Sequence, residues 1–132
     1  MIVLDASAAI ELLLALPLSK QVQEVVAEHD WQLAAPQLLE IEVLQVLRRR
    51  VASGHNSPEE AAEALELLGD LNIRYFDHQV VSGRIWELRE NLTAYDAAYV
   101  ALAELLEAPL LTTDIRSVNA PGHSARCLQL GI

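Results

Sequence analysis

The stretch Ile2-Val3-Leu4-Asp5 lies near the N-terminus, and a similar stretch, Leu110-Leu111-Thr112-Thr113-Asp114, lies near the C-terminus. Each is a short apolar run that is typical of a buried β-strand, and each ends on an aspartate. In an open parallel sheet, ligands bind at the carboxyl ends of the strands. Two carboxylates about 4 Å apart repel by roughly 4 kcal/mol at an effective dielectric constant near 20. Because a fold tolerates that repulsion mainly for a cation or for acid–base chemistry, the pair predicts a metal site.

Strand and helix patterns alternate between these two stretches. Ser57, Pro58 and Glu60 form a well-capped helix start, and Thr93 is expected to cap a later helix. Helices are expected over about 7–16, 19–29, 37–52, 58–68, 78–90, 94–107 and just after Asp114, and further strands near 31–35, 72–76 and 126–128. Strands separated by helices imply parallel crossover connections. The expected fold is α/β, a three-layer α/β/α sandwich with a central parallel sheet, in a single domain over residues 1–132.

The composition is that of a globular protein, with 52% hydrophobic and 21% charged residues. The net charge of −10 argues against a protein that grips a long nucleic acid through a broadly basic surface. It is compatible with a nucleic-acid enzyme that has a few well-placed basic residues, or with a basic partner. The single cysteine, Cys127, cannot form a disulfide within the chain, which is consistent with a reducing compartment.

The N-terminal region does not predict a secretory signal, since no Lys or Arg precedes Lys20, and Asp5 and Glu11 interrupt the apolar stretch. The run from Leu12 to Leu18 is too short to cross a bilayer and contains Pro17. We therefore expect a cytoplasmic protein with no membrane association. The leucines of this run wrap more than one helix face, which predicts burial against something beyond the sheet.

Asp5 and Asp114 also have a purely structural interpretation. Each could be the N-cap of the helix that follows its strand, and Ser7 could take that role in place of Asp5. Because two strands end in the same way, the pattern favours a functional site at both aspartates.

Glu42 lies on an expected helix with Leu38, Leu39 and Val46 three or four positions away, which places its side chain on the core-facing side. A carboxylate there is costly unless it is paired or binds a cation. Glu40 lies on a different face and is expected to be solvated. Glu42 is therefore the stronger candidate for the site.

Asp96 has two interpretations that the residues leave open. It could complete a capping box with Thr93 at the start of a helix. It also shares a helix face with Tyr99, Val100 and Ala103, which favours a partly buried carboxylate at a site.

Four stretches, in this order and spacing, resemble the PIN domain and, within it, the VapC-type toxins of bacterial toxin–antitoxin pairs. The most specific stretch is Tyr95-Asp96-Ala97-Ala98-Tyr99-Val100-Ala101-Leu102-Ala103. The agreement in length and element order extends over essentially the whole chain. The full set consists of residues 2–8, 36–43 with 46–49, 92–104 and 110–114.

The resemblance implies a PIN-like fold and a Mg²⁺- or Mn²⁺-dependent endoribonuclease that cuts RNA when its antitoxin is absent. The family's catalytic and metal-binding acids correspond to Asp5, Glu42, Asp96 and Asp114. Its hydroxyls beside these acids correspond to Ser7 and Thr112, which would orient carboxylates or water. The resemblance also implies a VapB-type antitoxin, whose C-terminal segment lies in a groove between helices and blocks the site, and a homodimer.

Arg89, seven residues before Asp96, corresponds to an arginine that is frequent in related toxins. It could contact a substrate phosphate, which a guanidinium matches in a bidentate way. It could equally form a surface ion pair, for example with Glu90. Trp31 and Trp86 are expected to be packing residues rather than base-stacking platforms.

The donor types suit a hard divalent cation, which prefers oxygen ligands and activates water for attack on a phosphate. A competing hypothesis is a phosphotransferase of the haloacid-dehalogenase type with Asp5 as nucleophile. That chemistry usually needs a second aspartate where this chain has Ser7, and a catalytic lysine, whereas the only lysine is Lys20. A third hypothesis is a catalytically silent PIN-like binding module, against which the complete set of four acids argues.

Overall fold

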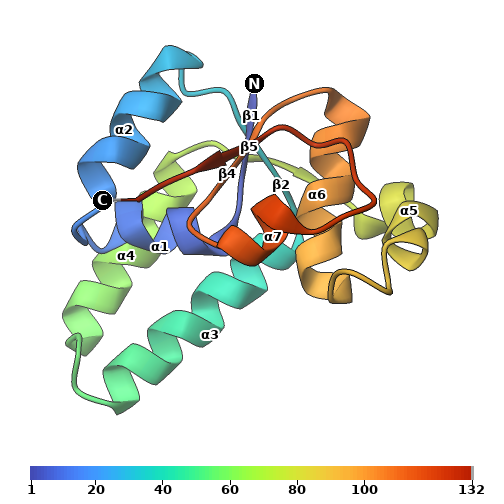
Figure 1. The fold of residues 1–132 in the computed structure, drawn as a ribbon. Coiled ribbons are helices and arrows are strands. Elements are labelled where there is room, and N and C mark those ends of the chain that lie inside the picture. The colour runs from blue at the N-terminus through green and yellow to red at the C-terminus, as the bar shows by residue number, and fades with distance from the viewer. Residues whose placement is uncertain (132) are drawn as a thin grey trace.

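The computed structural model describes residues 1–131 and contains a five-stranded sheet with the strand order β3-β2-β1-β4-β5, in which every pairing is parallel (Figure 1). The strands are β1 (Ile2–Leu4), β2 (Leu33–Pro36), β3 (Arg74–Phe76), β4 (Leu110–Thr112) and β5 (Cys127–Gln129). The helices are α1 (Ala6–Leu13), α2 (Ser19–Glu28), α3 (Leu38–Ala52), α4 (Pro58–Asp70), the 3₁₀ helix η1 (His78–Val81), α5 (Ser82–Glu87), α6 (Ala94–Leu106) and α7 (Ile115–Asn119).

The strand order reverses direction after β3, and this reversal sets the layers. The chain moves outward from β1 through β2 to β3, then returns to place β4 on the other side of β1. Right-handed crossovers in opposite directions place their helices on opposite faces of the sheet. Accordingly, α1 to α4 lie on one side of the sheet, and α5 and α6 lie on the other (Figure 1). This confirms the expected α/β sandwich with a central parallel sheet.

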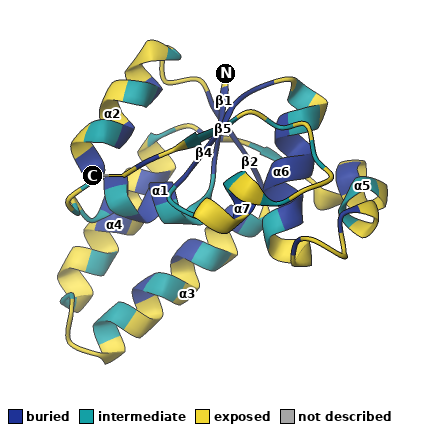
Figure 2. Ribbon diagram, in the orientation of Figure 1, coloured by how far each residue is buried: buried dark blue, intermediate teal, exposed yellow. Residues whose placement is uncertain are grey.

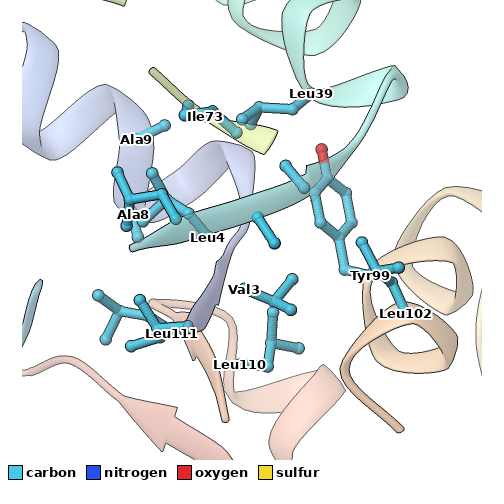
Figure 3. Close-up of a cluster of buried hydrophobic side chains, with 14 of the residues drawn as sticks. Val3, Leu4, Ala8, Ala9, Leu39, Ile73, Tyr99, Leu102, Leu110 and Leu111 are labelled. Atoms are coloured by element: carbon cyan, nitrogen blue, oxygen red, sulfur yellow. The ribbon is translucent and has the colours of Figure 1, made fainter. Parts of the chain in front are cut away.

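The core lies around the two central strands. All residues of β1, together with Leu110 and Leu111 of β4, are at most 1% exposed, so these short strands are covered on both faces (Figure 2). Uninterrupted apolar runs are what such strands require, because neither face meets water. The core includes side chains from α1, α3 and α6 that pack on the sheet from its two sides (Figure 3).

The first helix differs from the expected one at its start. Asp5, not Ser7, is the N-cap of α1, and its side chain accepts a hydrogen bond from the backbone amide of Ala8. Leu12 and Leu13 are buried, and the remaining leucines of the run pack against the core from partly buried positions. Because α1 contacts α2, α3 and α4 as well as the sheet, the chain itself covers more than one face of this helix.

The expected helix over 78–90 is divided. Asp77 accepts a hydrogen bond from the amide of Gln79 and starts η1, and Ser82 Oγ donates to the carbonyl of Gln79. The α-helix α5 then spans only Ser82–Glu87. Local side-chain bonds of this kind compete with regular helix, which explains the tighter 3₁₀ turn.

Several smaller expectations also change. The helix α4 continues through Gly69 to Asp70. Trp31 is 44% exposed and Trp86 is 68% exposed, so the expectation that both are packing residues is wrong for Trp86 in particular. Within residues 1–131, no helix is long and apolar enough to cross a membrane.

Candidate active site

Asp5 and Asp114 follow neighbouring strands at the same edge of the sheet. Val3 pairs with Leu110 and Leu4 with Leu111, and the amide of Asp5 donates to the carbonyl of Leu111 at 3.3 Å. The junction between β1 and β4 is where the strand order reverses, which is the point at which open α/β sheets bind ligands. The sheet therefore brings together the carboxylates from opposite ends of the sequence.

Ser7 connects the two strand ends by hydrogen bonds, and Thr112 forms a local bond at the end of β4. Ser7 Oγ donates to Asp5 Oδ1 at 2.6 Å and accepts from the amide of Thr113 at 2.9 Å. The fully buried Thr112 accepts from the amide of Asp114 at 2.9 Å through Oγ1. Both hydroxyls thus lie beside the acids, as the resemblance implied, and Ser7 holds the loop after β4 against the start of α1.

Two helices add the other carboxylates. Glu42 lies in the second turn of α3 and is half-buried, whereas Glu40 is exposed, as expected. Tyr99 of α6 donates a hydrogen bond to Glu42 Oε1. Asp96 lies in the first turn of α6, where its amide donates to Thr93 Oγ1 at 3.1 Å, so Thr93 is the cap and the carboxylate of Asp96 is not needed for capping.

The four acids are linked in a ring of electrostatic repulsions. Asp5 is repelled by Asp114 and by Glu42, and Asp96 is likewise repelled by Asp114 and by Glu42. Such a ring shows that the two strand ends and the two helices converge on one region. A cluster of like charges in a partly buried place favours a counter-cation or bound protons.

The pKa values of three of the acids reflect this environment. Burial raises the pKa of Asp5, and the hydroxyls of Ser7 and Thr112 oppose that rise. Burial also raises the pKa of Glu42 and of Asp96, with repulsion from the other acids adding to both shifts. Three carboxyls therefore hold protons more tightly than usual.

Asp114 differs because Arg116 neutralises it. The Arg116 Nε and Nη2 atoms donate to the two carboxylate oxygens of Asp114, both at 3.2 Å. The hydrogen bond from Arg116 lowers the pKa of Asp114, and the amide of Arg116 also donates to Asp114 Oδ1 at 2.9 Å, so Asp114 caps α7. The side chain of Arg116 is 83% exposed, so a ligand can displace it at little cost.

The residues fit a hard divalent cation by donor type, since carboxylate and hydroxyl oxygens are its preferred ligands. In the arrangement described for residues 1–131, no three of the His, Cys, Asp and Glu side chains converge as a ready-made ion cage. Each site carboxylate instead has its own partner, such as Ser7 for Asp5, Tyr99 for Glu42 and Arg116 for Asp114. Mg²⁺ keeps several waters and needs only one or two direct carboxylates, which this ring supplies.

The arginines are placed differently from the sequence-based expectation. Arg89 lies over the ring of Trp86, with 4.5 Å between its guanidinium carbon and the ring centroid, and donates to the Trp86 carbonyl. Its structural contact is therefore Trp86 and not an ion pair with Glu90. Arg116, which the sequence patterns did not single out, contacts a site acid directly. Its position two residues after Asp114, at the start of a helix, is the signal that could have indicated it.

Two adjoining cavities open beside the acids. One of about 400 Å³ is lined by Glu42 and Arg49 together with Leu38, Ile41 and Tyr95. The other, of about 560 Å³, shares Leu38, Ile41 and Tyr95 and extends to η1 and α5. The shared residues make these cavities one largely apolar groove that begins at Glu42.

Comparisons with known proteins agree with this architecture. Residues 2–121 match the PIN domain family. The chain is 48% identical over 92 residues to ribonuclease VapC1 of Mycobacterium tuberculosis, with 67% of each chain covered. It is also 36% identical over 125 residues to ribonuclease VapC12 of the same species, with 95% of each chain covered. The solved structure of VapBC2 from Rickettsia felis, bound to a DNA fragment from their promoter, superposes with a TM-score of 0.71 at 16% identity, covering 99% of this chain and 100% of the other.

The family match spans most of the chain, and the second relative is similar over nearly its whole length. The solved structure, at its low identity, supports the fold alone. Together with the α/β sandwich, these similarities lead to one assignment: the chain belongs to the PIN domain family and, within it, to the VapC ribonucleases.

Proposed function

We propose that the protein is the toxin of a VapBC-type toxin–antitoxin system, a Mg²⁺- or Mn²⁺-dependent endoribonuclease. The observation that supports this most directly is the ring of four acids near the β1–β4 junction, in which each acid is repelled by two others. The membership of the chain in the VapC ribonucleases indicates that the substrate is RNA. RNA as the substrate also supports a cytoplasmic location.

Asp5, Glu42, Asp96 and Asp114 would hold the cation. When bound, a divalent cation would polarise the scissile phosphate and supply an activated water for hydrolysis. Ser7 would keep the loop carrying Asp114 in register with Asp5, by accepting a hydrogen bond of 2.9 Å from the amide of Thr113. Thr112 would fix the backbone of Asp114 itself, by accepting a hydrogen bond of 2.9 Å from its amide. No side-chain nucleophile is needed for this reaction.

Basic residues near the acids would position the RNA. Arg49 lines the cavity that contains Glu42, and Arg116 contacts Asp114. Arg116 would leave Asp114 if the acids held a cation, and its guanidinium would then be free to bind a phosphate oxygen. Arg89, stacked on the exposed Trp86, would bind RNA farther from the scissile bond.

A cleavage assay with labelled single-stranded RNA in Mg²⁺ or Mn²⁺ tests the activity. Asp5→Asn and Asp96→Asn should each lower cleavage by at least about 10²-fold, because each removes a charge from the cation site. Glu40→Gln is a matched control, since this acid lies two residues from Glu42 but is exposed. Cleavage that persists in both aspartate variants, or in excess EDTA, would refute the mechanism.

The same assay separates the alternatives. A phosphotransferase that uses Asp5 would form a phosphorylated Asp5, detectable by mass spectrometry, and would not cut RNA. A silent binding module would bind RNA or a partner without cleaving, despite its four acids. Growth arrest on expression, relieved by the product of the neighbouring gene, would identify the toxin role.

The groove that begins at Glu42 is the proposed site of a VapB-type antitoxin segment. Its apolar lining suits a hydrophobic face, and the acids at its end suit a basic residue of the same segment. Ile85→Glu, which places a charge in the groove, should weaken toxin–antitoxin binding by more than about tenfold. Val80→Glu is the control, because Val80 is 58% exposed on the preceding turn and does not line the groove. Equal affinities of the two variants would exclude this binding site.

We also propose that the protein forms a homodimer. Leu44 and Leu65 are exposed apolar residues on α3 and α4, and both line a second groove between these helices. Light scattering should give twice the mass of 14.5 kDa for the free toxin. Leu65→Glu should shift the protein to a monomer, and an unchanged mass would place the interface elsewhere.

A further inference from the structure

Tyr99 connects the candidate site to the hydrophobic core. It is only 4% exposed, and Figure 3 shows its ring within the core cluster, projecting from α6 with the hydroxyl oxygen at the far end. That hydroxyl donates to Glu42 Oε1. The bond therefore joins α6 to α3, the two helices that contribute Asp96 and Glu42 to the ring of acids.

The hydroxyl is the donor in this bond, because an ionised carboxylate can only accept a hydrogen bond. The bond occupies one acceptor position on Oε1 and leaves the second carboxylate oxygen of Glu42 available. The tyrosine ring itself cannot move easily, because it is packed among core residues.

Among residues 1–131, the hydrogen bond that holds the Glu42 carboxylate is the one from Tyr99. It is half-buried on α3, next to an open cavity, and a glutamate side chain loses up to about 2 kcal/mol of rotamer freedom when it is held in place. The hydrogen bond from the rigid, buried Tyr99 already holds Glu42 in one rotamer. Less rotamer freedom is therefore lost when a ligand binds. Asp5 and Asp114 are held in the equivalent way by Ser7 and by the amide of Arg116.

We propose that Tyr99 is a positioning residue, whose hydroxyl holds the Glu42 carboxylate beside Asp5 and Asp96 in the orientation that binds the cation. This inference rests on the proposed metal-dependent activity. It predicts that the loss of one buried hydroxyl, with the ring retained, weakens cation binding although Tyr99 itself touches neither the metal nor the RNA.

A purely structural role is the alternative, because a buried tyrosine hydroxyl needs an acceptor in any protein. The two roles differ in what Tyr99→Phe changes. A structural role lowers stability alone. A positioning role lowers Mn²⁺ affinity in the absence of RNA and lowers kcat, while KM for RNA at saturating Mn²⁺ stays the same.

The experiment measures Mn²⁺ binding by electron paramagnetic resonance, then single-turnover RNA cleavage and the melting temperature. Tyr99→Phe should weaken Mn²⁺ binding and lower kcat by about 10-fold or more, within the range for groups that orient metal ligands. Tyr75→Phe is the matched control, since it removes a half-buried tyrosine hydroxyl on β3, outside the ring of acids. In the double variant with Glu42→Gln, the two losses should not add, because both act through one carboxylate.

The outcomes separate this inference from the proposed function. If the wild type cleaves RNA and Glu42→Gln impairs it, while Tyr99→Phe binds Mn²⁺ and turns over normally, only the positioning role is wrong. If the wild type neither binds Mn²⁺ nor cleaves RNA, the proposed function itself fails. Should Tyr99→Phe not fold, Glu42→Asp, which withdraws the carboxylate from the hydroxyl, should show the same loss of Mn²⁺ affinity, and unchanged affinity would overturn the inference.

Discussion

Asp5 and Asp114 follow neighbouring strands, and the side chain of each also caps the next helix. Asp5 accepts from the amide of Ala8 at 3.0 Å, and Asp114 accepts from the amide of Arg116 at 2.9 Å. Capping and cation binding are therefore compatible, because a carboxylate has about four lone-pair positions and a cap uses one or two. Capping also fixes each carboxylate in space before a cation arrives.

Divalent cations should stabilise the protein in a pH-dependent manner. Burial raises the pKa of Asp5, Glu42 and Asp96, so the metal-free folded state holds protons that the unfolded chain releases. Their contribution to stability is therefore greatest below the ordinary carboxyl range and falls as the pH rises through the raised values. Differential scanning fluorimetry with Mn²⁺ should show a rise of a few degrees in melting temperature near pH 7 and a smaller rise near about pH 5.

Asp5→Asn is the variant that checks this explanation. It should melt at or above the wild-type temperature without metal, because a buried, repelled charge is removed, and should lose most of the rise with Mn²⁺. Glu60→Gln, at an exposed acid of the α4 capping box, should keep the full rise. An equal rise in all three proteins would mean that Mn²⁺ binds outside the proposed site.

Arg116 should oppose cation binding in the free protein. Its guanidinium donates to both oxygens of Asp114, so a cation must displace it. We expect Arg116→Gln to bind Mn²⁺ about 2- to 10-fold more tightly while its kcat for RNA decreases, because the residue is also a proposed phosphate contact. Isothermal titration with Mn²⁺ and single-turnover cleavage test the two effects separately. Weaker Mn²⁺ binding in this variant would contradict the competition between arginine and metal.

The pair of Arg84 and Glu104 should stabilise the end of the chain. Arg84 donates to both oxygens of Glu104 at 2.9 and 3.1 Å, and Glu104 also accepts from the amide and hydroxyl of Ser124. The Arg84 hydrogen bond, above all, lowers the pKa of Glu104 from 4.5 to about 2. The resulting stability is present above about pH 4.5 and is lost as the pH falls toward 2.

Glu104→Gln should therefore lower the free energy of unfolding by about 1–3 kcal/mol near pH 7, a value reduced because Arg84 is partly exposed. The difference from the wild type should shrink as the pH falls below about 4.5. Urea denaturation at several pH values measures this. Glu66→Gln on the exposed face of α4 is the control and should change stability by less than about 0.5 kcal/mol. A loss that does not depend on pH would point to packing and not to the ion pair.

Arg89 should affect RNA binding more than catalysis. Its guanidinium is stacked on the exposed Trp86 and makes no contact with the four acids among its hydrogen bonds. Arg89→Ala should raise KM by a few-fold at unchanged kcat and reduce the salt dependence of binding by about one charge. Arg74→Ala is a matched control, since Arg74 is likewise stacked on an aromatic ring, that of Phe76, on the edge strand β3. A fall in kcat for Arg89→Ala would instead place this arginine at the scissile phosphate.

Local sequence patterns predicted most of the fold, because burial and helix capping act on residues that are close together in the sequence. The apolar run of β1 is uninterrupted since both faces of the strand are buried, and the cap at Thr93 depends on a hydrogen bond to an amide three residues later. The division of 78–90 into η1 and α5 was not predicted. It depends on the side chains of Asp77 and Ser82 bonding to nearby backbone, which competes with a regular helical pattern.

Sequence patterns placed Asp5 and Asp114 at strand ends and Glu42 on a core-facing helix position, and they left two interpretations open for Asp96. The groups that oppose or support these acids depend on contacts between distant elements of the fold. Tyr99 and Glu42 are 57 positions apart, and their hydrogen bond exists because the strand order reverses and places α3 and α6 on opposite faces of one sheet edge. Arg116 pairs with Asp114, and Arg89 stacks on Trp86. The sequence spacing of these arginines is compatible with several contacts, and the folded arrangement determines which one forms.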